Sequence, residues 1–301
     1  MSSPSAIFDR RLLALRQARA AAAHPPLPDF LLERVAEDFA ERLAIVRREF
    51  RLALNLGTHL GLVRRALAPL PNVGLLIDAE LAPESRPGTL VVGADEEALP
   101  FADGALDLVV SALSLQLVND LPGTLIQIRR TLKGDGLFLG ALLGGATLKE
   151  LREAWLVAEE EIAGGASPRV APFADVRDLG SLLQRAGFAL PVADSDTVTV
   201  TYPSSLHVMR EVKAMGASNM LSARRRVPVT RRLLMRACEI YTDRFGRADG
   251  RVPATFEIIT LTAWAPHESQ PKPLRPGSAQ HRLADALNVK EHKGPKGLGA
   301  E

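Results

Sequence analysis

Polar side chains and glycines follow the apolar runs in the first half of the chain, at the points where buried strands would end. In chain order they are Asn55, Gly57, His59 and Gly61 after the first run, Asp78 after the second, Asp95 and Glu96 after the third, and Ser111 in the fourth. In an open parallel sheet, ligands bind beyond the carboxyl ends of the strands. These residues are therefore best placed to do chemistry, and Ser111 would face the reacting centre.

Each group matches one part of an adenosine-containing ligand. Gly57 and Gly61, four residues apart at a strand-to-helix turn, would let a ligand approach the backbone and the unpaired N–H groups of the next helix. Asp78 could accept hydrogen bonds from both hydroxyls of a ribose. Asp95 or Glu96 could accept one from the exocyclic amine of an adenine. The ordered set favours an adenosine ligand, although each residue alone could equally serve packing.

Five apolar runs would position these residues. They span residues 50–57, 73–78, 89–94, 106–113 and 137–143, with helical patterns at 59–67 and 121–132 between them. Apolar strands that alternate with helices indicate a parallel sheet with helices on both faces. The predicted fold class is therefore α/β, with a doubly wound sheet that is mostly parallel.

The second half adds a different pattern. It contains helices at 147–163 and 174–187, a strand at 197–201, a helical block at 204–245 that is broken near 216–219 and Pro228, and a strand at 255–264. The two late strands would form an antiparallel edge on the same sheet. We therefore divide the chain into an N-terminal helical segment (1–49), an α/β domain (50–265) with a helical insert at about 204–245, and a tail (266–301). In the N-terminal segment, Asp29 would cap the second helix. The tail is rich in Pro, Gly and Lys, which predicts no stable structure.

Composition excludes several classes of function. The 301 residues include 37 basic and 35 acidic ones, so the chain lacks the positive field of a dedicated nucleic-acid binder. The single cysteine, Cys238, excludes a disulfide framework, a cysteine-based zinc site and an iron–sulfur ligand set. No uncharged apolar run approaches the roughly 18–20 residues that span a bilayer. We expect a soluble cytoplasmic protein without a transmembrane segment, for which peripheral association with a membrane stays open.

The histidines give no metal site in the sequence. Iron that activates oxygen is commonly held by two histidines and a carboxylate. None of the six histidines begins a His-x-Asp or His-x-Glu pair. His267 and Glu268 are adjacent, which places their side chains on opposite sides of an extended segment. We predict no metal site, and the sequence alone names no catalytic residue.

Several longer motifs resemble those of one known family. They are FADGALDLVV at 101–110, VNDLP at 118–122, APF at 171–173, MGASN at 215–219, VPAT at 252–255 and HESQ at 267–270. The chain resembles the class I S-adenosylmethionine-dependent methyltransferases and, within them, the mitochondrial complex I assembly factor 5 group and its bacterial relatives. With Phe8-Asp-Arg10 at the start, the resemblance reaches from there to about residue 279.

The resemblance implies a seven-stranded methyltransferase-like sheet and S-adenosylmethionine as the cofactor. Gly57 and Gly61 would then lie in the cofactor turn, Asp78 at the ribose and Asp95 near the adenine. The mitochondrial member is regarded as an arginine hydroxylase, so the resemblance also implies that activity. The implied partner is the respiratory complex I subunit that carries the terminal iron–sulfur cluster.

Several positions depart from the usual pattern of that superfamily. Asn55 stands where an acid usually helps to hold the ammonium group of the cofactor, and His59 stands where a glycine leaves room for its methionine part. Pro83 and Pro87 predict that the helix after the second strand is short or missing. Gln116 interrupts a motif often written Leu-His-Trp and is a candidate for substrate contact. Together these changes weaken the expected binding of S-adenosylmethionine.

Polar residues in the second half are further candidates for contact with a substrate. Tyr202, after the first late strand, could line the substrate mouth or could serve packing. Ser218 and Asn219 belong to a polar segment that matches the family, which makes them candidates as well. A cluster of arginines could meet an acidic partner or could form a solvated helix face; its members are Arg224, Arg225, Arg226, Arg231, Arg232 and Arg236.

Three functions stay open at this point. The first is an enzyme that acts on a protein in complex I assembly, by arginine hydroxylation or by methyl transfer. The second is a cofactor-free assembly chaperone that keeps the fold and a vestigial pocket. The third is a small-molecule methyltransferase of the kind that acts on acyl-carrier-protein esters in biotin synthesis. The fold alone cannot choose among them, because one fold hosts many activities.

Overall fold

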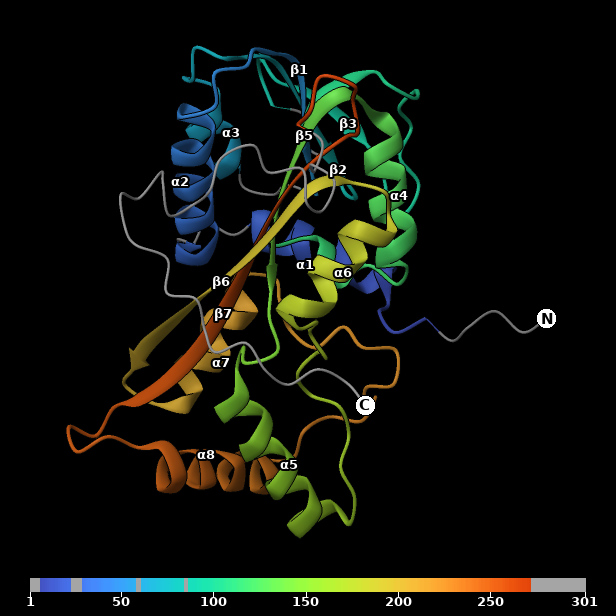
Figure 1. The fold of residues 1–301 in the computed structure, drawn as a ribbon. Coiled ribbons are helices and arrows are strands. Elements are labelled where there is room, and N and C mark those ends of the chain that lie inside the picture. Colours follow the sequence, from blue (N-terminus) through green and yellow to red (C-terminus); the bar gives the residue numbers. More distant parts are fainter. Residues whose placement is uncertain (1–5, 23–28, 58–60, 84–85, 272–301) are drawn as a thin grey trace, which may run out of the picture. The chain divides into compact units, whose positions relative to one another are not determined.

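The computed structural model describes residues 6–22, 29–57, 61–83 and 86–271 (Figure 1). Seven strands of this part form one sheet in the order β3-β2-β1-β4-β5-β7-β6. They are β1 (Phe50–Leu56), β2 (Val73–Glu80), β3 (Leu90–Gly93), β4 (Leu106–Ala112), β5 (Leu132–Leu143), β6 (Ala189–Tyr202) and β7 (Val252–Trp264). Strands β1 to β5 pair in parallel, whereas β7 is antiparallel to both β5 and β6. The predicted strands and the antiparallel edge are confirmed.

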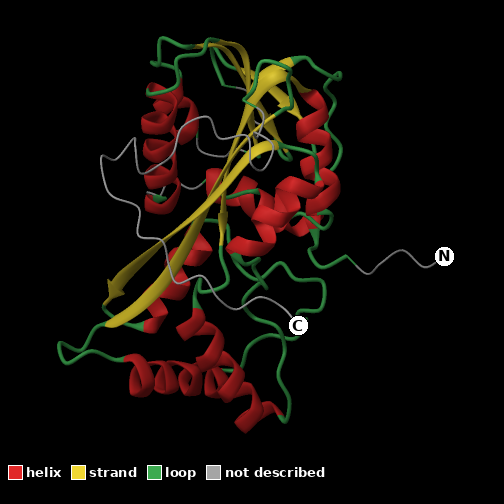
Figure 2. Cartoon of the chain, viewed as in Figure 1, coloured by secondary structure: helices red, strands yellow, loops and turns green. Residues whose placement is uncertain are grey.

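Helices cover both faces of the sheet. The described helices are α1 (Arg10–Ala21), α2 (Phe30–Ala44), α3 (Leu62–Leu67), the single 3-10 turn η1 (Leu115–Leu117), α4 (Leu121–Thr131), α5 (Lys149–Ala163), α6 (Val176–Arg185), α7 (Ser205–Ala214) and α8 (Arg231–Phe245). Figure 2 shows α2 and α3 on one face of the sheet and α4 and α6 on the other. The predicted doubly wound α/β class is therefore confirmed.

Two hydrophobic cores lie on the two faces, and β4 contributes to both. Leu108 and Val110 point into the core that α2 and α3 complete, whereas Leu106 and Val109 point into the core of α4 and α6. All seven residues of β4 are buried. This explains why the sequence of β4 reads as a continuous apolar run, as a central strand covered on both faces should.

Helix starts follow the expected capping chemistry. Asp29 caps α2, because its Oδ1 accepts a hydrogen bond from the backbone N–H of Leu32 at 3.1 Å. Asp9 caps α1 in the same way, through the N–H of Leu12 at 3.1 Å. The predicted cap at Asp29 is thus confirmed, and it fixes where the chain enters α2.

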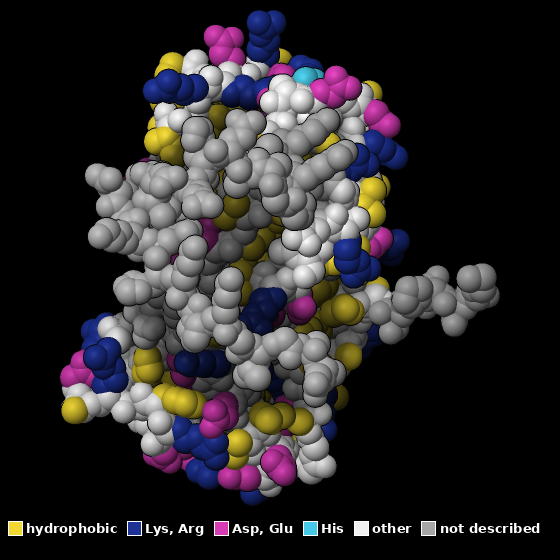
Figure 3. Space-filling model, viewed as in Figure 1, with side chains coloured by type: hydrophobic (Ala, Val, Ile, Leu, Met, Phe, Trp, Pro, Cys, Tyr) yellow, Lys and Arg dark blue, Asp and Glu magenta, His cyan; other side chains and the backbone are white. Residues whose placement is uncertain are grey.

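The helical insert between β6 and β7 consists of α7 and α8. Residues 215–230 between them contain no helix, which agrees with the predicted breaks near 216–219 and at Pro228. Helix α8 packs on α5, and its fully buried Tyr241 donates a hydrogen bond to the carbonyl of Pro253 at 2.7 Å. Figure 3 shows basic, acidic and hydrophobic side chains interspersed over the lower part of the view, where α5 and α8 lie. The insert thus extends the core beyond the parallel part of the sheet.

The connection from β2 to β3 lacks the usual helix. In the described residues 81–83 and 86–89 there is no helical turn, as Pro83 and Pro87 predict. Helix α3 begins at Leu62, directly after Gly61 with a φ of 66°. The predicted cofactor-site residue His59 and the start of the helix predicted at 59–67 lie outside the described residues, and so does most of the tail.

Candidate functional site

The carboxyl ends of β1 and β2 bring two predicted site residues together. Asn55 and Asp78 are direct neighbours across the parallel ladder. The Nδ2 atom of Asn55 donates a hydrogen bond to Oδ1 of Asp78 at 3.0 Å, and both side chains are fully buried. The Oδ1 atom of Asn55 is also buried and has no partner among the described residues.

Two arginines of the same chain neutralise Asp78. Arg64, on α3, donates from Nε to Oδ2 of Asp78 at 2.7 Å, and Nη2 of Arg86 lies 3.4 Å from the same oxygen. Arg86 also forms an ion pair with Glu80, two residues further along β2. The Asp78 side chain is 0% exposed. A ribose could therefore reach its carboxylate only by displacing a guanidinium.

A third arginine neutralises the two acids after β3. Nη2 of Arg10, on α1, lies 2.8 Å from Oδ1 of Asp95 and forms an ion pair with Glu96. Its Nη1 donates to the carbonyl of Leu117 at 3.2 Å. Burial lowers the pKa of Arg10, but the charges of Glu96 and Asp95 outweigh it, so the pKa lies above its ordinary value. These ion pairs thus hold α1 at the carboxyl end of β3, where the sequence predicted the adenine to bind.

The space beside Gly57, in the turn after β1, is filled by two side chains of the same chain. Gly57 has a φ of 73°, and a Cβ placed on it would lie 2.0 Å from Oγ of Ser114 and 2.7 Å from Oε1 of Glu96. Ser114 in turn donates a hydrogen bond to Glu96. A Cβ at Gly61 would meet no described atom within 4 Å. The close approach that Gly57 permits is therefore made by these two side chains.

Ser111 does not face an open site, contrary to expectation. Its Oγ donates to the carbonyl of Leu56 at 3.0 Å, and the residue is fully buried within the sheet. The physical reason is that β4 is a central strand, so a hydroxyl near its end can be satisfied by the carbonyl of neighbouring β1.

The described residues do not fit S-adenosylmethionine in this conformation. The ribose hydroxyls and the adenine amine both need accessible acceptors, yet Asp78 and Glu96 are buried and ion-paired, and Asp95 holds Arg10. Displacing an arginine would leave a buried carboxylate without its counter-charge, which is costly. Among the described residues, the unpaired Oδ1 of Asn55 is a group that could accept a hydrogen bond from the ammonium of the cofactor.

The structure also contains an apolar cavity of about 390 Å³, and Leu117, whose carbonyl accepts the hydrogen bond from Arg10, is part of its lining. Its walls come from α2, the segment after β5, α5, α7 and residues 217–221, and include Leu31, Leu143, Trp155, Met209 and Met215. Three residues predicted to contact a substrate line it, namely Gln116, Ser218 and Asn219. The structure thus gathers residues from positions 31 to 256 of the chain around one space, which is large enough for a long side chain.

The polar groups of the cavity are mostly satisfied by the protein itself. Asn219 donates to the carbonyl of Pro168 at 2.7 Å and accepts from the N–H of Leu221 at 3.1 Å. Gln116 donates from Nε2 to the carbonyl of Leu113 at 2.7 Å, but its Oε1 is buried without a partner among the described residues. Gln116 is therefore the group that offers a free acceptor beside the apolar walls.

Two leucines with left-handed backbones flank the cavity. Leu113, whose carbonyl holds Gln116, and Leu148, which lines the cavity, both have a φ of 52°. Leucine rarely adopts this conformation, and such strained residues cluster at ligand-binding sites. Arg169, also in the lining, lies 4.8 Å from the ring centroid of Trp155 and forms an ion pair with fully buried Glu159. Its positive charge is thereby neutralised.

Tyr202 is not among the described residues that line the cavity. It is buried in the core that α2, α5 and α8 share. Burial and a hydrogen bond with Glu211 raise the pKa of the Tyr202 hydroxyl above its ordinary value. The Tyr202 hydroxyl is thus bonded to α7, through Glu211.

The N-terminal segment links the predicted cofactor edge to the cavity, which the sequence did not reveal. Besides the contacts of Arg10, Arg16 donates to the carbonyl of Ser218 at 2.6 Å, and Asp9 forms an ion pair with Arg224 at 3.0 Å. Arg10 lies within a motif of the resemblance, and this was the one available signal for its role. Nothing in the spacing of the sequence connects it to acids some 85 residues away.

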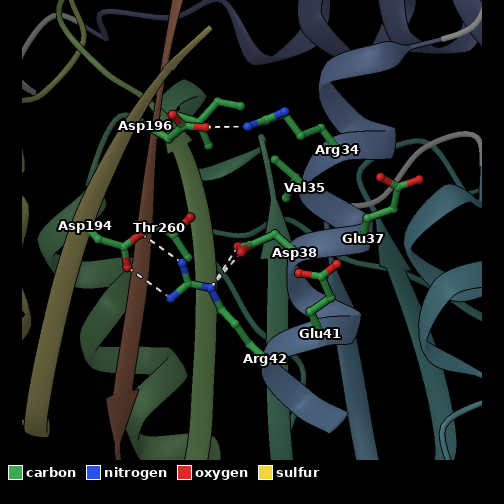
Figure 4. A pocket seen from close by; sticks show the side chains of 10 residues that line it. Arg34, Val35, Glu37, Asp38, Glu41, Arg42, Asp194, Asp196 and Thr260 are labelled. Atoms are coloured by element: carbon green, nitrogen blue, oxygen red, sulfur yellow. Dashed lines mark hydrogen bonds and ion pairs between the residues drawn. The ribbon is translucent and has the colours of Figure 1, made fainter. Parts of the chain in front are cut away.

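A second, charged groove lies between α2 and the β6–β7 edge. Figure 4 shows Arg42 between Asp38 and Asp194, with the hydrogen bonds to both marked. Arg34 and Asp196 form another bridge at 2.7 Å. The groove has a volume of about 240 Å³. These ion pairs fasten α2 to the edge of the sheet, so the groove has a structural explanation.

The described residues contain neither a metal-binding cluster nor a membrane-spanning helix. No group of three or more His, Cys, Asp and Glu side chains in this part of the chain could hold a metal ion. No helix of the described ranges is long and apolar enough to cross a membrane.

Comparisons with known proteins agree with this architecture. Residues 54–140 match a family described as a methyltransferase domain. The arginine hydroxylase NDUFAF5 of Homo sapiens mitochondria is 41% identical over 283 residues, covering 91% of this chain and 81% of the relative, and that of Rattus norvegicus is 39% identical over 300 residues, covering 96% and 87%. A malonyl-[acyl-carrier protein] O-methyltransferase of Gallionella capsiferriformans is 34% identical over 290 residues, covering 91% and 96%.

Solved structures share the fold. A structure from Bacillus halodurans, described as a candidate methyltransferase, superposes with a TM-score of 0.54 at 17% identity, covering 76% of this chain and 98% of that one. The YcgJ protein of Bacillus subtilis gives a TM-score of 0.53 at 13% identity, covering 78% and 99%. The seven-stranded sheet with its flanking helices is therefore the methyltransferase-like one that the motifs imply.

Proposed function

We propose, from the premise that this chain belongs to the class I S-adenosylmethionine-dependent methyltransferase superfamily and within it to the NDUFAF5 group, that it acts in the assembly of respiratory complex I. It does so by binding an arginine-containing segment of the subunit that carries the terminal iron–sulfur cluster. The observation that supports this most is the apolar cavity of about 390 Å³, which three residues predicted to contact a substrate line.

The chemistry of the cavity suits an arginine side chain. Its walls of leucine, methionine and tryptophan match the aliphatic stem, and such pockets usually carry a few placed polar groups. The unpaired Oε1 of Gln116 supplies an acceptor for a guanidinium N–H. Because Arg169 is paired with Glu159, it does not repel an incoming positive charge strongly.

The test is binding of the purified subunit to the full chain. Ala171→Trp would fill part of the cavity, and we expect it to weaken binding at least about ten-fold, which is about 1.4 kcal/mol. Ala248→Trp, in an exposed turn away from the cavity, is the matched control and should bind as the native chain does. Equal binding by both variants, with unchanged melting temperatures, would remove the cavity from the proposal.

We further propose that this binding needs no S-adenosylmethionine, because Arg10, Arg64 and Arg86 occupy the acids that would hold it. Calorimetric titration with S-adenosylmethionine and S-adenosylhomocysteine tests this. The expected result is no heat of binding in the micromolar range. Saturable micromolar binding by the native chain would contradict it and would favour an enzyme.

Two observations favour such an enzyme as the second candidate. The buried Oδ1 of Asn55 has no partner in the described part, and relatives about 40% identical are named arginine hydroxylases. Co-expression with the subunit followed by mass spectrometry would then show an arginine peptide heavier by one oxygen or one methylene. A methyltransferase acting on malonyl-acyl-carrier protein, as one relative is named, would instead methylate that ester in a purified assay.

A further inference from the structure

A fully exposed basic segment runs from the loop before α8 into the first turn of that helix. Every residue from Arg225 to Arg232 is exposed, and the segment reads RRVPVTRR. It thus consists of two arginine pairs on either side of Val227, Pro228, Val229 and Thr230. Figure 1 shows the loop that leads into α8, and the second arginine pair forms the first two residues of that helix.

The four arginines of this segment carry unneutralised charge. Their side chains form no hydrogen bond or ion pair within the described ranges, whereas those of neighbouring Arg224 and Arg236 are paired with Asp9 and Glu161. No aspartate or glutamate occurs in the 27 residues between Glu211 and Glu239, while seven lysines and arginines do. The segment therefore presents a local positive field on a chain that is almost neutral overall.

Aliphatic side chains are exposed among these charges. Val227 is 61% exposed and Val229 is 40% exposed. Met235 is 45% exposed and follows Arg231 by four residues, which places both on one face of α8. Single exposed apolar residues need no explanation. Their interleaving with unpaired cations is the pattern of surfaces that enter the headgroup region of a bilayer.

We propose that the segment from Arg225 to Arg232 docks on the anionic surface of a lipid bilayer, with the arginines at the phosphates and Val227 inserted between headgroups. Charge complementarity requires an anionic occupant, and an anionic bilayer can pair with the arginines and also take up the exposed valines between its headgroups. Val229 also lines the 390 Å³ cavity, so docking would bring the rim of the cavity to the membrane. The inference does not depend on what the cavity binds.

Co-sedimentation of the full chain with vesicles tests this proposal. Vesicles of phosphatidylcholine alone are compared with vesicles of equal parts phosphatidylcholine and phosphatidylglycerol, at low and at high salt. We expect binding to the anionic vesicles alone, and we expect salt to weaken it, because exposed charges are screened. An arginine near an anionic surface strengthens binding about five-fold, so Arg225→Gln with Arg226→Gln should weaken it about 25-fold.

The controls separate this segment from general positive charge. Arg47→Gln with Arg51→Gln removes the same charge from exposed positions before and at the start of β1, and should leave vesicle binding unchanged. Val227→Ser should weaken binding several-fold without altering the net charge. All variants change exposed residues, so their melting temperatures should match that of the native chain.

Three outcomes would overturn the proposal. They are no binding to anionic vesicles, equal loss in the two double variants, or full binding by the Arg225→Gln, Arg226→Gln variant. Binding to soluble polyglutamate without binding to vesicles would assign the segment to an acidic protein instead, and would overturn the membrane proposal as well.

Discussion

Replacing Arg10 with methionine should measure how much the ion pairs of Arg10 with Asp95 and Glu96 contribute to the free energy of unfolding. Methionine keeps the apolar stem but removes the guanidinium. The Arg10 side chain is 13% exposed, and its partner Glu96 is 3% exposed, so the ion pair between them is largely shielded from water. Asp95, the second partner, is 36% exposed and can be rehydrated.

The expected loss follows from these environments. Removing one partner of a buried ion pair typically costs about 3–5 kcal/mol, because the other charge stays buried without compensation. Glu96 keeps its hydrogen bond from Ser114, and Asp95 regains water, so we expect the lower end, about 3 kcal/mol. For a domain of this size, that corresponds to a decrease in melting temperature of roughly 6–12 °C.

Urea denaturation of four proteins measures this: the native chain, Arg10→Met, Glu96→Gln and the double variant. Because Glu96→Gln removes the unpaired charge, the double variant should be more stable than Arg10→Met by about 2 kcal/mol. Hydrogen exchange in α1 should also become faster in Arg10→Met. A loss below about 1 kcal/mol, or strictly additive effects, would refute the view that Arg10 holds these acids.

Two other predictions concern the turn after β1 and a buried carboxylate. Gly57→Ala should lower the free energy of unfolding by well over about 2 kcal/mol, because it adds a clash with Ser114 to the strain of a positive φ. Gly61→Ala should lower it only by the strain, about 1–2 kcal/mol. Similar losses for the two variants in urea denaturation would contradict the crowding at Gly57. Burial raises the pKa of Glu159, but hydrogen bonds from Ser167 and Arg169 lower it more, to below its ordinary value of 4.5. The stability that ionised Glu159 contributes is therefore present above pH 4.5 and is lost as the pH falls through the lowered pKa of the folded state. Glu159→Gln should flatten the acid limb of a curve of stability against pH. An unchanged acid limb would show that Glu159 does not contribute.

The central strands could be predicted because burial on both faces leaves a continuous apolar run in the sequence. The edge strand β6 could not be predicted in full. It spans Ala189–Tyr202, whereas the sequence indicated only residues 197–201. The part before residue 197 contains Asp194 and Asp196, which form ion pairs with Arg42 and Arg34 of α2, so the reason for a strand there lies in another element. The sequence pattern alone does not predict a strand at these residues.

The candidate site shows the same division. Order along the chain was enough to place Asn55 beside Asp78, because strand ends in a parallel sheet converge. The partners of the acids could not be foreseen, because the pair of Arg10 and Glu96 joins residues 86 positions apart and depends on where α1 lies. Tyr202 was ambiguous for a related reason, since its direction depends on the position of Glu211 in the insert.

The internal arginines have a consequence for how such a protein behaves in a living cell. A protein that keeps its acids free for a diffusing ligand gains stability from that ligand, so its folded population rises and falls with the metabolite supply. Here the counter-charges are attached to the polypeptide, and their effective concentration is set by chain connectivity. The folded fraction of this protein should therefore stay constant through nutritional change.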